Sequence, residues 1–218
     1  MIPVRRSEIH RYLGYAGKTP DEETDAMIER LIPRLEEAVS PAYIYKTFPL
    51  SWDNDIPVLE SVPLQSRNLS RNLKGCGKVS VFACTLGIGA DRLIRRTELK
   101  SMAEASVLQA IAAAMAEEVC DEVNRTIAQE AKEAGLYVRP RYSPGYGDLS
   151  LETQKLVFSL LHPEKAIGVT LTDALLMVPS KSVTALIGLS ETEEPCILQG
   201  CEECSIHETC VYSRTGGE

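Results

Sequence analysis

The sequence predicts an α+β fold, in which a mixed or antiparallel β-sheet lies under a layer of helices. Two segments, 20–39 and 102–134, carry apolar residues at helical spacing. Short apolar stretches with the character of strands lie between and after them. Only two pairs of these stretches are close enough for tight hairpins, so a mixed or antiparallel sheet fits this order of elements best.

The N-terminal half begins with a capped helix. In Thr19-Pro20-Asp21-Glu22, Thr19 is the expected capping residue, Pro20 takes the first helical position and Glu22 lies three residues after the cap. The helix is predicted to run to about Val39. Its apolar face is formed by Ile28, Leu31, Ile32, Leu35 and Val39. Strands are then predicted at 43–50, 58–64 and 79–86, with a helical turn at 67–73 and a helix at 91–97.

The longest predicted element is the alanine-rich helix 102–134, with Gly135 as its stop. Its many alanines permit close packing against a neighbour. Its apolar stripe consists of Val107, Ile111, Ala114, Val119, Val123 and Ile127. A helix at 151–161 and strands at 167–171, 174–178 and 183–189 complete the predicted pattern.

Composition narrows the function classes. At 218 residues the chain is long enough for one well-filled domain with a tail. Its net charge of −8 and its lack of long Lys/Arg clusters argue against nucleic acid as a partner. No window has the roughly 18 to 20 apolar residues that span a membrane, so we expect no membrane association and a cytoplasmic location.

The segment 141–148 has the composition of a ligand-binding loop. Pro144-Gly145 specifies a tight turn in which backbone amides can approach a ligand closely. Arg141 offers a forked cation for a carboxylate or phosphate, Tyr146 a flat surface, and Asp148 an acceptor for an ammonium or hydroxyl group. A plain strand-to-helix turn has the same local composition, so local chemistry leaves both interpretations open.

The segment 141–155 resembles the signature loop of the activation domain of cobalamin-dependent methionine synthase, which reads Arg-Pro-Ala-Pro-Gly-Tyr and then, after a spacer, Thr-Glu-Lys. Gln154 stands where the family has Glu, and 147–150 replaces the family's spacer. The similarity extends over residues 75–190, through the strand at 79–87, the long helix and the closing hairpin at 178–188. The residues in register are Arg141, Pro144, Gly145, Tyr146, Thr153 and Lys155.

The resemblance implies a methionine synthase activation domain-like fold over residues 1–190 and a site for S-adenosylmethionine. It implies that Arg141 holds the carboxylate of the ligand, that the backbone around Ser143, Pro144 and Gly145 approaches the ligand, and that Tyr146 lies near the reacting methyl group. Asp148 completes the expected binding set. Arg139, in the neighbouring Arg139-Pro140, is the alternative to Arg141.

The same resemblance implies partners. The family's cobalamin signature, Asp-x-His-x-x-Gly, is absent from this sequence, so the cobalamin is expected on a separate methionine synthase, with a flavodoxin or ferredoxin as electron donor. The chain would then be a reactivating component of a methyltransferase in methionine biosynthesis, not a complete enzyme. The alternatives are a reactivator of another corrinoid methyltransferase and a non-catalytic metal-binding assembly subunit.

Residues 191–218 form a separate cysteine-rich tail. Four thiolates in one short segment are typical of an iron–sulfur cluster or a structural zinc site, and His207 could replace one of them. Disulfides are one competing interpretation, which a cytoplasmic location disfavours. A disordered, metal-free tail is the other, because the segment is polar. The electron transfer implied by the resemblance favours the cluster. The predicted metal ligands are Cys196, Cys201, Cys204 and Cys210.

Overall fold

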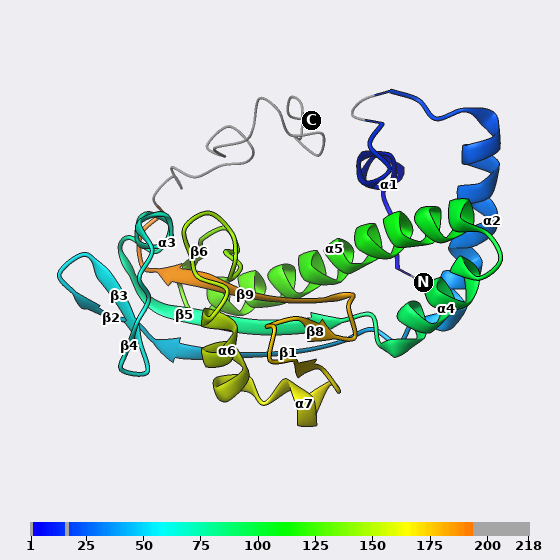
Figure 1. Ribbon diagram of the computed structural model, residues 1–218. Coiled ribbons are helices and arrows are strands. Elements are labelled where there is room, and N and C mark those ends of the chain that lie inside the picture. Colours follow the sequence, from blue (N-terminus) through cyan, green and yellow to red (C-terminus); the bar gives the residue numbers. More distant parts are fainter. Residues whose placement is uncertain (1, 16–17, 194–218) are drawn as a thin grey trace.

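The computed structural model describes residues 2–15 and 18–193. Its centre is a four-stranded antiparallel sheet (Figure 1). Phe82 on the second strand pairs with Tyr45 on one side and with Ala185 on the other. In spatial order the strands are β1 (Ala42–Pro49), β5 (Cys76–Thr85), β9 (Ser182–Ser190) and β6 (Tyr137–Val138).

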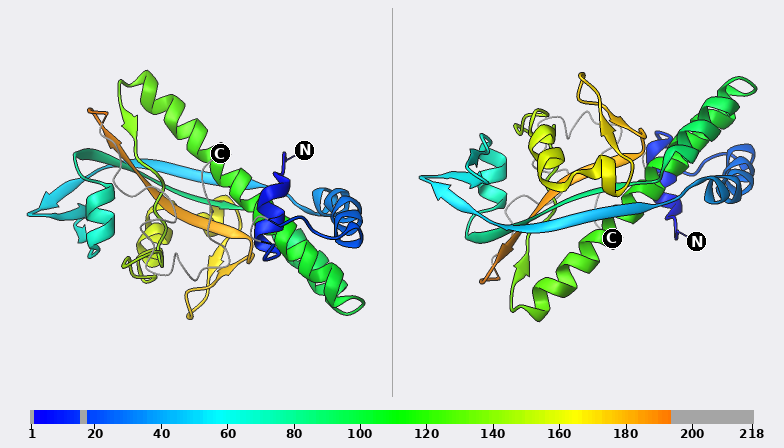
Figure 2. Two further views of the ribbon diagram at one scale, coloured as in Figure 1. Left: turned by 90° about the horizontal axis from the view of Figure 1, so that it is seen from above. Right: turned by 90° about the horizontal axis from the view of Figure 1, so that it is seen from below.

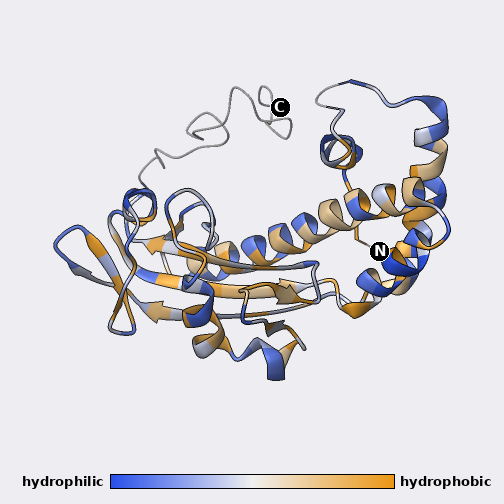
Figure 3. Ribbon diagram, in the orientation of Figure 1, coloured by the Kyte–Doolittle hydropathy of each residue, from blue (hydrophilic) through white to orange (hydrophobic). Residues whose placement is uncertain are grey.

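The central strand β5 is covered on both faces. Successive side chains of a strand point to opposite faces of its sheet. Phe82 and Cys84 therefore enter one core, with the long helix and its neighbours, while Val79, Val81 and Ala83 enter a second core on the other face. Burial on both sides explains why β5 is mostly apolar along its length (Figure 3).

Helix α5 (Met102–Glu133) covers one face and crosses the strands obliquely (Figure 2). It begins where the Ser101 hydroxyl accepts a hydrogen bond from the backbone N–H of Glu104, at 3.2 Å. Small buried residues such as Ala112 and Ala114 bring its backbone close to its neighbours. Three further helices complete this core: α1 (Arg6–Tyr12), α2 (Glu22–Ala38) and α4 (Ile88–Glu98).

Shorter elements cover the opposite face and the end of the sheet (Figure 1). Two small antiparallel sheets accompany them: β2–β3–β4 beyond one end of the main sheet and β7–β8 beside α7. The bounds are β2 (Ser51–Asp53), β3 (Ile56–Leu59), β4 (Val62–Pro63), α3 (Arg67–Asn72), α6 (Thr153–Leu161), α7 (Pro163–Ala166), β7 (Thr170–Leu171) and β8 (Met177–Val178).

The α+β class, the antiparallel sheet and the long helix are as predicted, whereas two local predictions are wrong. Asp21, not Thr19, caps α2, because its carboxylate accepts from the backbone N–H of Thr24 at 2.8 Å. The predicted strand 58–64 is divided by a turn at Glu60 and Ser61. Both turn residues have positive φ, as in the two-residue turns of β-hairpins.

Candidate functional site

The predicted ligand loop leaves the sheet at the edge of β9. The N–H of Arg139 donates to the carbonyl of Gly188 at 2.8 Å, and Tyr142 exchanges two backbone hydrogen bonds with Leu186 at 2.8 and 2.9 Å. Residues 137–142 thus run as an interrupted edge strand against β9. This pairing fixes the position from which the loop 143–150 begins.

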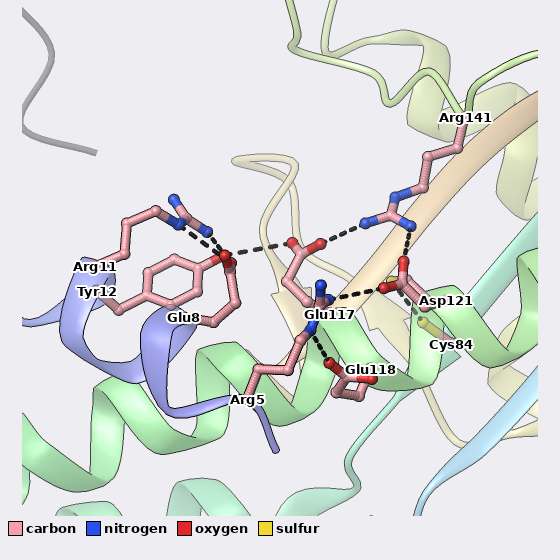
Figure 4. A network of polar contacts seen from close by, with 10 residues as sticks. Arg5, Glu8, Arg11, Tyr12, Cys84, Glu117, Glu118, Asp121 and Arg141 are labelled. Atoms are coloured by element: carbon pink, nitrogen blue, oxygen red, sulfur yellow. Dashed lines mark hydrogen bonds and ion pairs between the residues drawn. The ribbon is translucent and has the colours of Figure 1, made fainter. Parts of the chain in front are cut away.

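Arg141 extends from this edge over the middle of α5 (Figure 4). Its guanidinium donates to the carboxylates of Glu117 and Asp121, at 2.6 Å for Asp121. Burial lowers the pKa of the guanidinium, but the hydrogen bond that it donates to Asp121 and the surrounding negative charge raise that pKa above its ordinary value overall. The cation is therefore held permanently charged, in a fixed place, between two carboxylates one helical turn apart.

The same carboxylate cluster joins helix α1 to the site (Figure 4). Arg5 donates to Glu118 at 2.6 Å and to Asp121 at 3.0 Å, and the Tyr12 hydroxyl donates to Glu117 at 3.4 Å. Tyr12 also lines a cavity of about 350 Å³ between α1, α5 and the start of β9.

Lys181 also lines that cavity. Its ammonium donates to the carbonyl of Gln109 at 3.5 Å. Burial lowers the pKa of Lys181, against the opposing influence of Asp91. The cavity is therefore lined by a cation, and its Tyr12 connects it to Glu117, one of the carboxylates that hold Arg141.

The loop itself turns tightly at its two glycines. Gly145 has φ +85° and donates its N–H to the carbonyl of Leu149 at 2.9 Å. Gly147 has φ +56°, and a Cβ atom there would lie 2.5 Å from the Tyr142 hydroxyl oxygen, so this position requires glycine. Tyr146, 53% exposed, packs edge-on against the buried Tyr142 ring, with 5.5 Å between ring centroids. Pro144 is buried and Ser143 half-buried.

Asp148 is exposed, but its carboxylate is engaged by hydrogen bonds from other residues of the protein. Its carboxylate accepts hydrogen bonds from the Ser66 hydroxyl and from the backbone N–H groups of Arg67 at 2.8 Å and Asn68 at 3.3 Å. Partial burial raises the pKa of this carboxyl group, but the three hydrogen bonds outweigh that effect and hold it below its ordinary value. Asp148 thus fastens the loop to the start of α3, and a ligand would have to compete for its acceptors.

Arg139 and Arg141 point to different parts of the molecule. Arg139 is buried, and its guanidinium donates to the carbonyl of Lys74 at 3.3 Å, in the connection between α3 and β5. Arg141 faces the carboxylates of α5 and is 23% exposed. Of the two, Arg141 is thus the one beside a charged and partly open surface.

Sequence reasoning missed Glu117, Asp121 and Tyr12, which surround Arg141. The signal for the first two was their spacing of four residues, which puts both carboxylates on one face of an otherwise alanine-rich helix. Nothing in the sequence indicates that this face of the helix contacts Arg141. Tyr12 belongs to α1, a helix that was not predicted.

The predicted metal ligands Cys196, Cys201, Cys204 and Cys210 lie outside the described residues. Within residues 2–15 and 18–193, no three His, Cys, Asp or Glu side chains are grouped as metal ligands would be. In the same part of the chain, no helix is long and apolar enough to cross a membrane. The Cys84 and Cys120 sulfur atoms lie 3.4 Å apart in the core, where their hydrogen bond and burial raise the pKa of the Cys120 thiol.

Comparison with known proteins identifies both a family and a fold. The model of the family described as "Vitamin B12 dependent methionine synthase, activation domain" matches residues 71–194, which is more than half of the chain. The chain is also similar to the crystal structure of the MetH reactivation domain bound to AdoHcy. The identity is 18% and the TM-score 0.60, and the similarity covers 88% of this chain and 78% of that one.

None of the curated proteins matches this chain. The likeness to the MetH reactivation domain establishes the fold, which is that of a methionine synthase activation domain. The match of the family model over residues 71–194 includes the whole loop 141–150 and all of α5. The chain therefore belongs to the family of vitamin B12-dependent methionine synthase activation domains.

Proposed function

We propose that this protein binds S-adenosylmethionine and presents it to a cobalamin carried by a separate cobalamin-dependent methionine synthase. Family membership supports this proposal. So does the similarity to a reactivation domain whose crystal structure contains AdoHcy, since S-adenosylhomocysteine is what remains of S-adenosylmethionine once its methyl group has been transferred.

The charged cluster on α5 is chemically suited to the amino-acid end of that ligand. Arg141 is a forked donor that can bind a carboxylate through two parallel hydrogen bonds. Glu117 and Asp121, which hold Arg141 in the absence of ligand, are acceptors for an ammonium group. A zwitterion would thus meet both of its charges within one cluster. We regard this pairing of Arg141 with two carboxylates as the observation that carries the proposal.

The loop supplies the remaining contacts in this proposal. The tight turn leaves Gly145 exposed next to Tyr146, and in this proposal the backbone around Ser143, Pro144 and Gly145 approaches the ligand there. The half-exposed Tyr146 ring would lie against the ligand near the reacting methyl group. Asp148 would act through the loop, because its carboxylate holds the start of α3.

When bound, S-adenosylmethionine supplies an electrophilic methyl group to a cobalt that has received one electron from a donor such as a flavodoxin or ferredoxin. This chain contributes binding and orientation. Transfer of a methyl group from sulfur to a metal moves no proton, so the residues around Tyr146 need no general base. The fixed Arg141 and the fastened loop would define the direction in which the methyl group points.

The reactivation assay tests this proposal directly. A methionine synthase that lacks its own activation domain is oxidised to the cob(II)alamin form and mixed with this chain, S-adenosylmethionine and a reductant. The absorption spectrum should change to that of methylcobalamin, and Tyr146→Ala should slow the change. If the cob(II)alamin spectrum does not change with methionine synthase but does change with another corrinoid methyltransferase, that second enzyme would be the partner.

We further propose that residues 191–218 form a separate metal-binding segment, in which Cys196, Cys201, Cys204 and Cys210 bind an iron–sulfur cluster or zinc. Protein purified without oxygen would then contain stoichiometric iron and sulfide, or zinc, by elemental analysis. Truncation after residue 193 should abolish the metal content and leave the far-ultraviolet circular dichroism of the domain unchanged. Metal retained by the truncated chain would refute this assignment.

A further inference from the structure

A second hollow lies between the β2–β3 hairpin and helix α3, away from the Arg141 cluster. The hairpin and α3 stand at the same end of the main sheet (Figure 1). Its volume is about 560 Å³, within the roughly 300–1,000 Å³ of typical small-molecule sites. Trp52 and Ile56 line it on the hairpin side, and Arg67, Arg71 and Lys74 on the helix side. We call this hollow the α3 pocket.

The helix side of the α3 pocket is strongly basic. Arg67, Arg71 and Lys74 are spaced four and three residues apart, which puts them on one face of α3 and its continuation. All three side chains are exposed, and none of them forms an ion pair with another residue in the described ranges 2–15 and 18–193. Asp55, on the opposite rim, is the carboxylate that lines the pocket. In a protein with a net charge of −8, this is a local excess of positive charge.

The hairpin side offers an apolar wall with a fixed aromatic ring. The Trp52 indole N–H donates to the carbonyl of Cys76 at 3.1 Å, which holds the ring in place. Trp52 is half-buried, so part of it remains available to a ligand. A flat ring beside an apolar wall is suited to stacking against another flat ring.

We propose that the α3 pocket binds a nucleoside phosphate, with its base against Trp52 and its phosphates on Arg67, Arg71 and Lys74. A guanidinium group can bind a phosphate through two parallel hydrogen bonds, and a neighbouring ammonium group adds a further positive charge. The volume accommodates both parts of such a ligand. This proposal uses no residue of the Arg141 cluster and does not rest on the function proposed above.

Trp52 makes the test direct, because it is the one tryptophan of the 218-residue chain. Its fluorescence is followed while ADP, pyrophosphate or adenosine is added separately. ADP should cause a saturable change, at a lower concentration than pyrophosphate, which lacks the ring, and than adenosine, which lacks the phosphates. An unchanged signal with ADP would overturn the proposal. An ADP affinity no higher than that of pyrophosphate would reduce the site to a plain anion patch and would also overturn it.

Matched variants separate a built site from general charge attraction. Arg71→Gln and Lys74→Gln should each weaken ADP binding about tenfold, because each removes one charged contact with phosphate. Arg95→Gln removes the same charge from an exposed position on α4 and should leave the affinity unchanged. These side chains are exposed, so thermal melting should be the same for all variants. Equal weakening by Arg95→Gln would contradict the proposed site.

Discussion

Replacing Asp148 by alanine should destabilise the protein measurably, although the side chain is exposed and lies in a loop. The change removes the acceptor for the Ser66 hydroxyl and for the N–H groups of Arg67 and Asn68. Those two N–H groups stand at the start of α3, where a helix has no internal partners for its first donors. The loop 143–150 also loses its fastening to α3.

The size of the effect follows from these contacts. A hydrogen bond to a charged group contributes about 1.5–3 kcal/mol to stability, and loss of a helix cap costs about 0.5–2 kcal/mol. Water can hydrogen-bond to the exposed groups after the mutation, so we expect a total loss of stability of about 2 kcal/mol for the three hydrogen bonds together. For a chain of this length, that lowers the melting temperature by about 4–8 °C. Asp148→Asn keeps one acceptor oxygen and should cost about half as much.

Calorimetric melting of both variants at pH 7 is the assay, with Asp173→Ala as the control. Asp173 is exposed and carries the same charge. Because the folded pKa of Asp148 lies below its ordinary value of 3.8, its contribution is complete above that pH and is lost as the pH falls below it. The difference in melting temperature between Asp148→Ala and the natural protein should therefore become smaller below about pH 4. A melting temperature for Asp148→Ala within about 1 °C of the natural protein at pH 7 would refute this reasoning.

Three further changes probe other parts of the structure. In Gly147→Ala, the alanine must adopt φ +56° and displace the Tyr142 ring, so the free energy of unfolding should fall by about 2 kcal/mol. The variant should also bind S-adenosylmethionine more weakly, and an affinity equal to that of the natural protein by calorimetry would contradict the proposed loop site. The hydrogen bond to Glu130, with burial and negative charge, raises the pKa of Tyr45 to about 12, so a spectrophotometric titration should lose one late-titrating tyrosine in Tyr45→Phe. Its contribution to stability is present below pH 10 and lost as the pH rises towards 12. Ser101→Ala removes the cap of α5 and should lower the melting temperature by about 2–4 °C; an unchanged value would show that packing alone fixes the start of the helix.

Elements with strong local signals were predicted well. Helix α5 begins at Met102 as predicted and ends one residue before the predicted Ala134, because the apolar stripe and Gly135 mark it locally. The short elements α1 and β6 were missed, because contacts with distant residues of α5 and β9 stabilise them. The three-residue strand β2 was also missed, although its partner β3 is close in sequence. The hairpin at Glu60 and Ser61 lacks the Asn-Gly or Asp-Gly pair that usually marks such turns.

The site was located from its loop, but its chemistry depends on contacts between distant residues. Arg141 meets Glu117 and Asp121, which lie 24 and 20 residues earlier in the chain, and sequence alone does not show which helix face covers the sheet edge. Asp148 was predicted as a ligand contact because of its charge and its place beside Tyr146. Its hydrogen bonds to residues about 80 positions earlier are a consequence of the tertiary fold.

The most direct test of the central claim is a calorimetric titration of the oxygen-free protein with S-adenosylmethionine. We expect saturable binding at one site. Arg141→Ala should weaken it by at least tenfold through loss of a charged contact. Arg125→Ala, an exposed change on the same helix, should leave it unchanged. Tyr146→Ala, at an exposed position that leaves the charged cluster intact, provides a second weakened variant. Absence of binding to the folded natural protein, or equal affinity in Arg141→Ala and Arg125→Ala, would contradict the account.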